Sequence, residues 1–232
     1  FCQQALDQDL TETPLLRRLT WQYHWFNRDY SGFDDFLSNL NSKRRKQIRR
    51  ERREITQTDI EFEVLSGKEI NEQHWQSFYP FYCSTFERKW GEPRFTLPFF
   101  QSLSETMPEN IVLFMAKHQR RYIAGAFAIR SEHNLYGRHW GYSHSIRNLH
   151  FECCYYQTIE YCIQQGLKKL DAGIQGEHKI FRGFEPVISQ SYHWISDADF
   201  RRAINDFLLH ETDHIKQQVN LLNQHIPYKL RV

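Results

Sequence analysis

Three strand-like segments follow one another between residues 111 and 142, and this run constrains the fold more than any other feature. The segments 111–117, 121–131 and 134–142 are rich in apolar residues, and Gln119-Arg120 separates the first two at a turn position. Consecutive strands joined by such short connections pair antiparallel. The sequence therefore predicts an antiparallel meander.

Helix and strand signals of both kinds surround this meander. Leu149–Gly166 is the clearest helix, with Gly166 as its stop signal, and Asp197 is expected to cap a last helix over residues 199–223. Ser31 and Ser42 are expected to cap two earlier helices. The remaining segments are strands at 19–25, 60–66 (an edge strand), 167–172 and 187–195, helices at 69–90 and 97–107, and a helical turn at 179–184. This order predicts an α/β fold.

Composition limits the class of protein. The chain has 232 residues, of which 40% are hydrophobic, enough for one sizeable core. No apolar run approaches the roughly 20 residues that a membrane helix needs. Five cysteines with no C-x-x-C pair make a disulfide framework improbable and predict a reducing, cytoplasmic location. Because the chain starts at Phe1 without a signal peptide, we expect a preceding part of the protein.

One basic block stands out from an otherwise balanced chain. Residues 43–53 contain eight Lys or Arg and one Glu, whereas the whole chain carries a net charge of only +2. A helix through this block could contact several phosphates, and Lys43, Arg44, Arg45 and Arg49 are the candidate contacts. A tRNA or an anionic cell-wall precursor would suit it. A solvated helix, or one packed against an acidic partner domain, explains the block equally well.

The segment 173–186 concentrates chemically active side chains. Glu177, His178, Lys179 and Arg182 place an acid, an imidazole, an amine and a guanidinium close together, and Gly173, Gly176 and Gly183 punctuate them. Glycines let a backbone approach a ligand closely. The cluster predicts part of an active site, although each of these residues taken alone could be solvated or paired within the protein.

Several longer motifs resemble a known family. They are FDDFLSNLNSKRRKQIRRERREI, GRHWG, LHFECCYYQTIEYCIQQGL, GIQGEHKIFRGFEP and SYHW. Together with the element order they resemble the FemAB-like family within the GNAT superfamily of N-acyltransferases, over nearly the whole chain. The resemblance implies a GNAT-like mixed, mostly antiparallel sheet flanked by helices over residues 59–232. Residues 1–58, with their strand and basic helix, would then be the remnant of a preceding GNAT-like half.

The resemblance also implies a site and a reaction. A GNAT fold holds its acyl donor where two neighbouring strands diverge, here those at 134–142 and 167–172, and an amine attacks the acyl carbon. Glu177 and His178 would then be candidate bases, with Glu152 as a further one. The candidate substrate-binding residues are Gln175, Gly176, Lys179, Arg182, Trp140 and His150. The acceptor would be an amine-bearing small molecule or a peptidoglycan precursor.

The donor is constrained by an absent motif. Acetyl-CoA-dependent GNAT enzymes carry a glycine-containing loop before the central helix, whose amides bind the pyrophosphate. The corresponding segment here, 143–151, has no glycine. The resemblance therefore favours aminoacyl-tRNA over acyl-CoA as the donor, with no metal.

Other readings of the chain remain open. His150, Cys153 and Cys154 lie on one helix, but they lack the further paired ligands of a zinc site and signal no activated thiolate. The chain could be a non-catalytic module that binds tRNA or an anionic cell-wall precursor. Its site could also need the preceding half of the protein.

Overall fold

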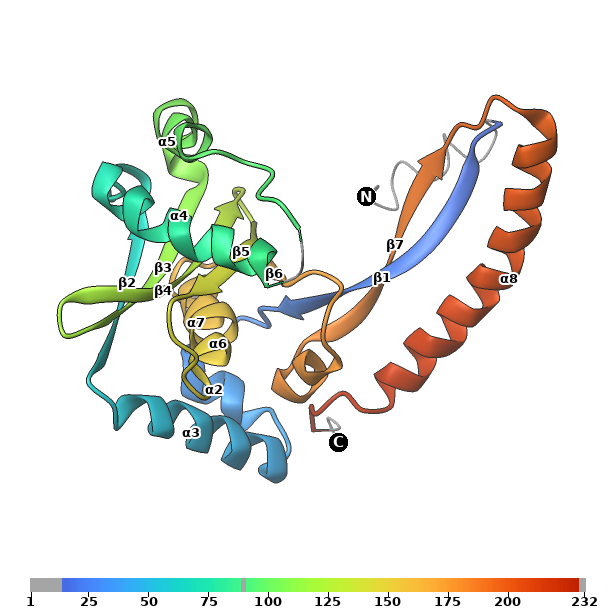
Figure 1. Cartoon of the computed structure of the whole chain (residues 1–232). Coiled ribbons are helices and arrows are strands. Elements are labelled where there is room, and N and C mark those ends of the chain that lie inside the picture. The colour runs from blue at the N-terminus through green and yellow to red at the C-terminus, as the bar shows by residue number, and fades with distance from the viewer. Residues whose placement is uncertain (1–13, 89–90, 230–232) are drawn as a thin grey trace. The chain divides into compact units, whose positions relative to one another are not determined.

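The computed structural model describes residues 14–88 and 91–229, which form two compact units (Figure 1). The larger unit contains Trp25–Gly173 and the chain from Tyr228. The smaller unit contains the described residues up to His24 together with Ile174–Pro227. Each unit is described by itself.

The larger unit is built on the predicted meander. β2 (Ile60–Ser66), β3 (Ile111–His118), β4 (Arg121–Arg130) and β5 (Asn134–Tyr142) pair antiparallel in that order, and β6 (Lys169–Asp171) joins β5 in parallel. The positive φ angles of Gln119 and Arg120 make the tight β3–β4 turn. The meander, its turn and the edge position of β2 are confirmed.

Two helices cover one face of this sheet. α4 (Glu72–Glu87) and α5 (Leu97–Thr106) bury an aromatic core against β3 and β4, centred on Trp75, Phe78, Phe100 and Phe127. Burying each such side chain contributes roughly 1.5–3 kcal/mol. Gly125 lets α4 lie close to the sheet, since a Cβ there would stand only 3.0 Å from the Phe78 ring. The short η3 (Pro108–Asn110) leads into β3.

The basic segment forms a helix that begins one residue earlier than predicted. α2 (Phe33–Ser38) follows Gly32, and α3 (Ser42–Thr56) follows Asn41, whose side chain accepts a hydrogen bond from the Arg44 amide at 3.0 Å. The predicted caps Ser31 and Ser42 were therefore wrong. Asn41 competes with Ser42 for the same role, and asparagine is at least as good a cap. Ile48, Glu51 and Ile55 form the buried face of α3.

The clearest predicted helix contains a wider turn. It runs as α6 (Leu149–Phe151), a π-helical turn η4 (Glu152–Tyr156) and α7 (Gln157–Gln164). It stops at Gly166, whose φ of 65° suits glycine, as predicted. A π turn inserts an extra residue into the helix and is frequent at functional sites.

The smaller unit is a two-stranded ribbon with a long helix. β1 (Leu16–Phe26) pairs antiparallel with β7 (Glu185–His193), from Leu16–His193 to His24–Glu185. α8 (Ala198–Asn223) runs beside this ribbon (Figure 1) and is capped by Asp197, as predicted. A 3-10 helix, η5 (Glu177–Arg182), occupies the expected helical turn.

The strand order over the whole chain is β2-β3-β4-β5-β6-β1-β7, since β1 continues from the smaller unit into the larger. The α/β class with a mixed, mostly antiparallel sheet is therefore confirmed. The two units divide the chain at residues 24/25, 173/174 and 227/228, whereas the predicted boundary lies between residues 58 and 59. That boundary, and the preceding half it implies, remain predictions.

Candidate functional site

The predicted site residues fall in both units. Gln175, Gly176, Glu177, His178, Lys179 and Arg182 belong to the smaller unit, whereas Trp140, His150 and Glu152 belong to the larger one. The predicted phosphate contacts Lys43, Arg44, Arg45 and Arg49 are all on α3 of the larger unit.

Glycines fix the backbone of the polar segment in the smaller unit. η5 starts after Gly176 (φ 92°) and ends at Gly183 (φ 87°), both in the left-handed region where other residues are strained. A Cβ on Gly176 would lie 2.3 Å from the His178 ring. The absence of a side chain at Gly176 therefore makes room for the His178 ring, independently of any contact between Gly176 and a substrate.

The side chains of η5 differ sharply in exposure. Glu177 and Gln175 are exposed and His178 is half-buried, whereas Lys179 and Arg182 are only 4% and 2% exposed. Arg182 donates a hydrogen bond to the His178 carbonyl at 2.9 Å, and the Lys179 ammonium lies 5.4 Å from the centre of the Tyr23 ring. Burial, reinforced by the charge of Glu177, raises the pKa of Tyr23. Glu177 keeps the accessibility that its predicted role as a base needs.

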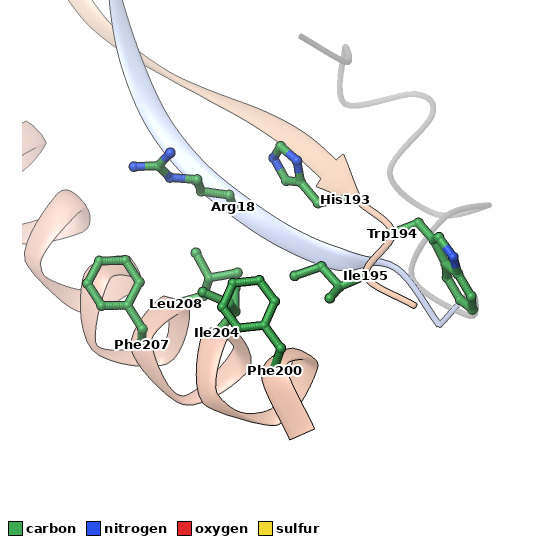
Figure 2. Close-up of a pocket in the computed structure, with 8 residues that line it drawn as sticks. All are labelled: Arg18, His193, Trp194, Ile195, Phe200, Ile204, Phe207 and Leu208. Carbon is green, nitrogen blue, oxygen red and sulfur yellow. The ribbon is translucent and has the colours of Figure 1, made fainter. Parts of the chain in front are cut away.

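A groove of about 330 Å³ lies elsewhere in the smaller unit (Figure 2). Its apolar wall comes mainly from α8, and Arg18 at its edge makes a two-point ion pair with Glu211 at 2.8 and 2.9 Å. The lining residues are Arg18, His193, Trp194, Ile195, Phe200, Ile204, Phe207 and Leu208. None of them was predicted as a site residue.

The predicted divergence of two strands is present in the larger unit. β5 and β6 pair at only three positions, the last being Tyr136–Asp171, and β5 continues for six residues without β6 beside it. A β-bulge lies near the start of this free stretch, because Phe127 pairs with His139 and Ala128 with Gly137, so that Arg138 has no partner in the β4–β5 register. Bulges bend a strand and redirect its side chains, often beside active sites.

Side chains of α4 take the place that β6 leaves. The Ser143 amide donates to Ile123 of β4, so the alternating backbone groups of Trp140 and Tyr142 point away from β4. The Trp140 carbonyl accepts from Thr85 Oγ1 at 2.7 Å, and the Tyr142 carbonyl accepts from Arg88 Nη2 at 3.2 Å. Both carbonyls of the free edge are thus occupied by the protein itself.

This contact depends on the glycine at the end of the GRHWG motif. A Cβ on Gly141 would stand 1.9 Å from the Phe81 carbonyl oxygen, an impossible distance. The missing side chain lets the backbone of α4 touch the backbone of β5. The neighbouring Gly137 is less crowded, since its Cβ would lie 3.5 Å from the Asp171 carbonyl.

Trp140 and His150 come together, as their shared prediction requires. Their ring centroids are 5.4 Å apart, and His150 lies 5.2 Å from the Tyr155 ring in an edge-to-face arrangement. Phe151 stacks on Tyr155 to complete the cluster. Trp140 and His150 are both partly exposed, so the cluster can meet a ligand.

The start of α6 is closed to an anion. Asn148 adopts a left-handed backbone (φ 64°) and donates from its side chain to Glu54 at 2.8 Å, while Arg147 lies 3.6 Å from the same carboxylate. The Leu149 amide already donates to the Ile146 carbonyl at 3.2 Å. A carboxylate of the protein therefore lies beside the residues that precede α6.

Glu152 sits in a buried ionic cluster. Its Oε1 accepts from Arg52 Nη2 at 3.0 Å and from Gln157 Nε2 at 2.8 Å, and Arg52 also pairs with Glu160 at 2.8 Å. Burial raises the pKa of Glu152, and its Oε2 is buried with no hydrogen-bond partner among the residues described. These are the contacts of a structural ion pair, and the role of Glu152 as a base remains a prediction.

The π turn brings a second carboxylate to this cluster. Tyr156, the last residue of the turn, donates its hydroxyl to the buried Glu51 of α3, which also accepts from Gln47 at 2.8 Å. The Arg52 guanidinium lies 4.4 Å from the centre of the Phe33 ring. One side of α3 is thus fastened to the central helix by charge and hydrogen bonding.

The remaining cations of α3 divide into two groups. Arg44 bonds Gln47, Arg45 bonds the Leu40 carbonyl, and Arg49 pairs with Asp34 at 3.1 Å. Lys43, Lys46, Arg50 and Arg53 are exposed at spacings of three and four residues, which places them on one face. Of these, Arg50 also pairs with Glu54 at 3.8 Å. Of the four predicted phosphate contacts, Lys43 alone belongs to this exposed stripe.

His139 is a candidate that the sequence analysis did not select, although it lies within the quoted GRHWG motif. It belongs to the free stretch of β5, next to the bulge, and is partly exposed. Burial, with help from the charge of Arg138, lowers its pKa to about 4. An isolated histidine in a strand gives no sign of this environment before the tertiary structure is known.

Two of the buried thiols are not activated. Burial raises the pKa of both Cys153 and Cys162, so neither is a reactive thiolate. Within residues 14–88 and 91–229, no three metal-binding side chains converge. In the same residues no helix is both long and apolar enough to cross a bilayer.

Comparison with known proteins gives the class to which this fold and site belong. Residues 1–230 match the model of the FemAB-like family, described as peptidoglycan biosynthesis/recognition. The chain belongs to the FemAB-like family. The FemAB-like family, predicted from the motifs and the element order, is confirmed. No curated protein matches the sequence.

Three solved structures share the fold at low sequence identity. A conserved protein of unknown function from Bacteroides thetaiotaomicron has 15% identity and a TM-score of 0.54, covering 82% of this chain and 66% of its own. The C-terminal domain of a protein described as a lysylphosphatidylglycerol synthetase, from Agrobacterium fabrum, has 10% identity and a TM-score of 0.54, covering 87% and 68%. L-PGS from Bacillus licheniformis has 10% identity and a TM-score of 0.53, covering 97% and 70%. This chain spans about two thirds of each.

Proposed function

We propose that the protein transfers an aminoacyl group from aminoacyl-tRNA to an amine, with a peptidoglycan precursor as the acceptor class. The observation that carries the proposal is the divergence of β5 from β6 beyond Tyr136–Asp171 in a member of the FemAB-like family. Beyond its last pair with β6, β5 can hold a short aminoacyl group and the attacking amine close together, beside the partly exposed rings of Trp140 and His150. The family description, peptidoglycan biosynthesis/recognition, supports the acceptor class.

Two features argue against acyl-CoA as the donor. Glu54 holds the start of α6, so a pyrophosphate there would meet a carboxylate in place of free amides. Along β5, a pantetheine chain would have to displace Thr85 and Arg88 from the Trp140 and Tyr142 carbonyls. One of the similar structures is described as part of a lysylphosphatidylglycerol synthetase, a name that denotes an aminoacylated product. That name supports an aminoacyl group as the transferred unit.

The exposed acid of η5 is the proposed base in this reaction. Glu177 is exposed and follows the flexible Gly176, and His178 is half-buried beside it. Either can accept the proton that the attacking amine loses. Lys179 and Arg182 are buried, so their proposed part is to hold an anionic group that reaches them or to fix η5 itself.

The donor is tested directly with labelled substrates. The protein is incubated with a mixture of radiolabelled aminoacyl-tRNAs and a muramyl-pentapeptide nucleotide that bears a free amine, and ribonuclease-resistant label is counted. A parallel incubation with acetyl-CoA follows release of the free thiol. Label transfer without thiol release supports the proposal. Thiol release that depends on the amine would overturn the choice of donor.

The site is tested by substitution. Glu177→Gln and His178→Ala should each lower transfer by about a hundredfold to ten-thousandfold, the usual range for removing a proton-transfer group. Ile174→Ala, also exposed and three residues from Glu177, is the matched control for a change on the same segment. Full activity in both Glu177→Gln and His178→Ala, with unchanged folding, would remove η5 from the site.

A second candidate function rests on the exposed stripe of α3. Lys43, Lys46, Arg50 and Arg53 fit the phosphates of a polyanion, as a non-catalytic binding module for tRNA would need. Replacing all four by Gln should flatten the salt dependence of tRNA affinity by about one unit of slope per lost contact. The matched control replaces Arg44 and Arg45, which contact the protein. A wild-type affinity that does not change with salt would exclude phosphate contacts.

A further inference from the structure

The ring of His139 is held on one side by aromatic neighbours. It lies parallel to Phe127 of β4 with a centroid distance of 6.2 Å, and Tyr82 of α4 meets it edge-to-face at 4.8 Å. Phe95, before α5, and Phe100, within α5, stand at 6.0 and 6.5 Å. This cage fixes the plane of the imidazole without any polar contact.

The nitrogens of this ring are available. Neither makes a hydrogen bond within the described part of the chain, and the side chain is partly exposed, so a polar group can reach it from outside. A histidine that merely fills a core normally has its nitrogens paired. Among the groups around the ring, Tyr82 is titratable and Arg138 is charged, and the other three are phenylalanines. The imidazole is therefore neutral near pH 7 and can accept a hydrogen bond.

The position of His139 along β5 adds the second argument. The last pair with β6 is Tyr136–Asp171, and Gly137 and the bulge at Arg138 follow, so His139 is the first residue paired with β4 beyond the bulge. The side chain of the next residue, Trp140, lies on the opposite face of the sheet, next to the His150 ring. The strand thus presents an unpaired imidazole at the point where the proposed donor and acceptor would meet.

We propose that His139 contacts the acceptor, taking a hydrogen bond from the attacking amine and so aiming the nitrogen lone pair at the acyl carbon. This assignment rests on the proposed transfer reaction and names a further residue for it. In that reaction the C–N bond forms and the ester C–O bond to the tRNA ribose breaks. The proton lost by the amine ends on the ribose oxygen that leaves, so the imidazole is not consumed.

The first test follows the histidine itself. In protein labelled with ¹⁵N-histidine, glycinamide is titrated at pH 7.5 and the ring nitrogen resonances are recorded. The expected result is a saturable shift of the His139 resonances that exceeds the shifts of His118 and His74 severalfold. No shift at His139, or equal shifts at all three, would overturn the proposal.

The second test follows the reaction. His139→Phe keeps an aromatic ring in the cage but has no nitrogen, and His139→Gln restores a hydrogen-bond acceptor. We expect His139→Phe to shift the partition of the aminoacyl group from the amine towards water by about tenfold, and His139→Gln to recover part of that. His118→Phe is the control, since His118 lies at the far end of β3. An unchanged partition in His139→Phe would refute the contact between His139 and the acceptor. If the wild-type protein transfers no aminoacyl group at all, the proposed function is refuted. The ¹⁵N titration then decides by itself whether His139 binds an amine.

Discussion

Two titratable side chains of the larger unit, Glu152 and His139, show opposite ways of keeping a polar group inside a protein. Glu152 is closed in, since Arg52 and Gln157 occupy one carboxylate oxygen and only 3% of the residue is exposed. His139 is held by aromatic rings alone and keeps both nitrogens without a partner in the described chain. The difference teaches that burial by itself does not mark a functional group. A functional group is marked by a hydrogen-bonding atom that has no partner within the described chain and that a ligand can reach.

Removing Arg52, the cationic partner of Glu152, should have the largest effect on the free energy of unfolding. Arg52→Ala leaves Glu152 buried without its cation, and breaking a buried pair from one side costs about 3–5 kcal/mol. Urea unfolding of the variant measures the loss. The double variant Arg52→Met with Glu152→Met is the control, and it should recover most of the stability because the carboxylate that then loses its cation, Glu160, is partly exposed to water. A loss below about 1 kcal/mol in Arg52→Ala would show that the cluster is open to water.

The contact between α4 and β5 can be broken next. Gly141→Ala forces a methyl group against the Phe81 carbonyl, so the helix must move away from the strand, at a cost of about 1–3 kcal/mol. Gly137→Ala on the same strand meets its nearest atom at 3.5 Å and should cost less than about 1 kcal/mol. Thermal unfolding of both variants compares them. Equal losses would mean that α4 does not rest on β5 as described.

Acid should distinguish His139 from other histidines. Its pKa of about 4 in the folded protein lies below the ordinary value of 6.5, so the folded state binds fewer protons than the unfolded state between these values. Its contribution to stability is present above pH 6.5 and is lost as the pH falls towards 4, by on the order of 2 kcal/mol. The free energy of unfolding of wild type and His139→Phe, measured from pH 7.5 to 4, should converge on the acid side by that amount. Parallel curves would assign the ring an ordinary pKa.

The sequence predicted regular elements well because their signals are local. The β3–β4 turn at Gln119-Arg120 and the Asp197 cap of α8 depend only on neighbouring residues, and both are confirmed. The same local reasoning failed at Ser42, where Asn41 offered an equally good cap one residue earlier. The divergence of β5 and β6 followed from the family resemblance and is present in the structure.

The site was less accessible to prediction because its decisive contacts join distant residues. Arg52 and Glu152 are 100 positions apart, and nothing near Glu152 in the sequence shows that an arginine will neutralise it. The cage of His139 comes from β4, α4 and α5, so the sequence showed only an isolated histidine. The π turn at Glu152–Tyr156 is invisible for a different reason, since its composition is that of an ordinary helix.

The smallest effect on stability is expected for an ion pair on the exposed side of α3. Arg49 pairs with Asp34 at 3.1 Å, almost the same distance as Arg52 to Glu152, but the two side chains of the surface pair are 57% and 85% exposed. Water screens such a pair, so Arg49→Gln should change the free energy of unfolding by less than about 0.5 kcal/mol, and less still in 0.5 M salt. Urea unfolding beside Arg52→Ala measures both on one helix. The N–O distance is nearly the same in the two ion pairs. A loss of stability in Arg49→Gln close to that in Arg52→Ala would therefore show that burial does not set the different strengths of the two ion pairs.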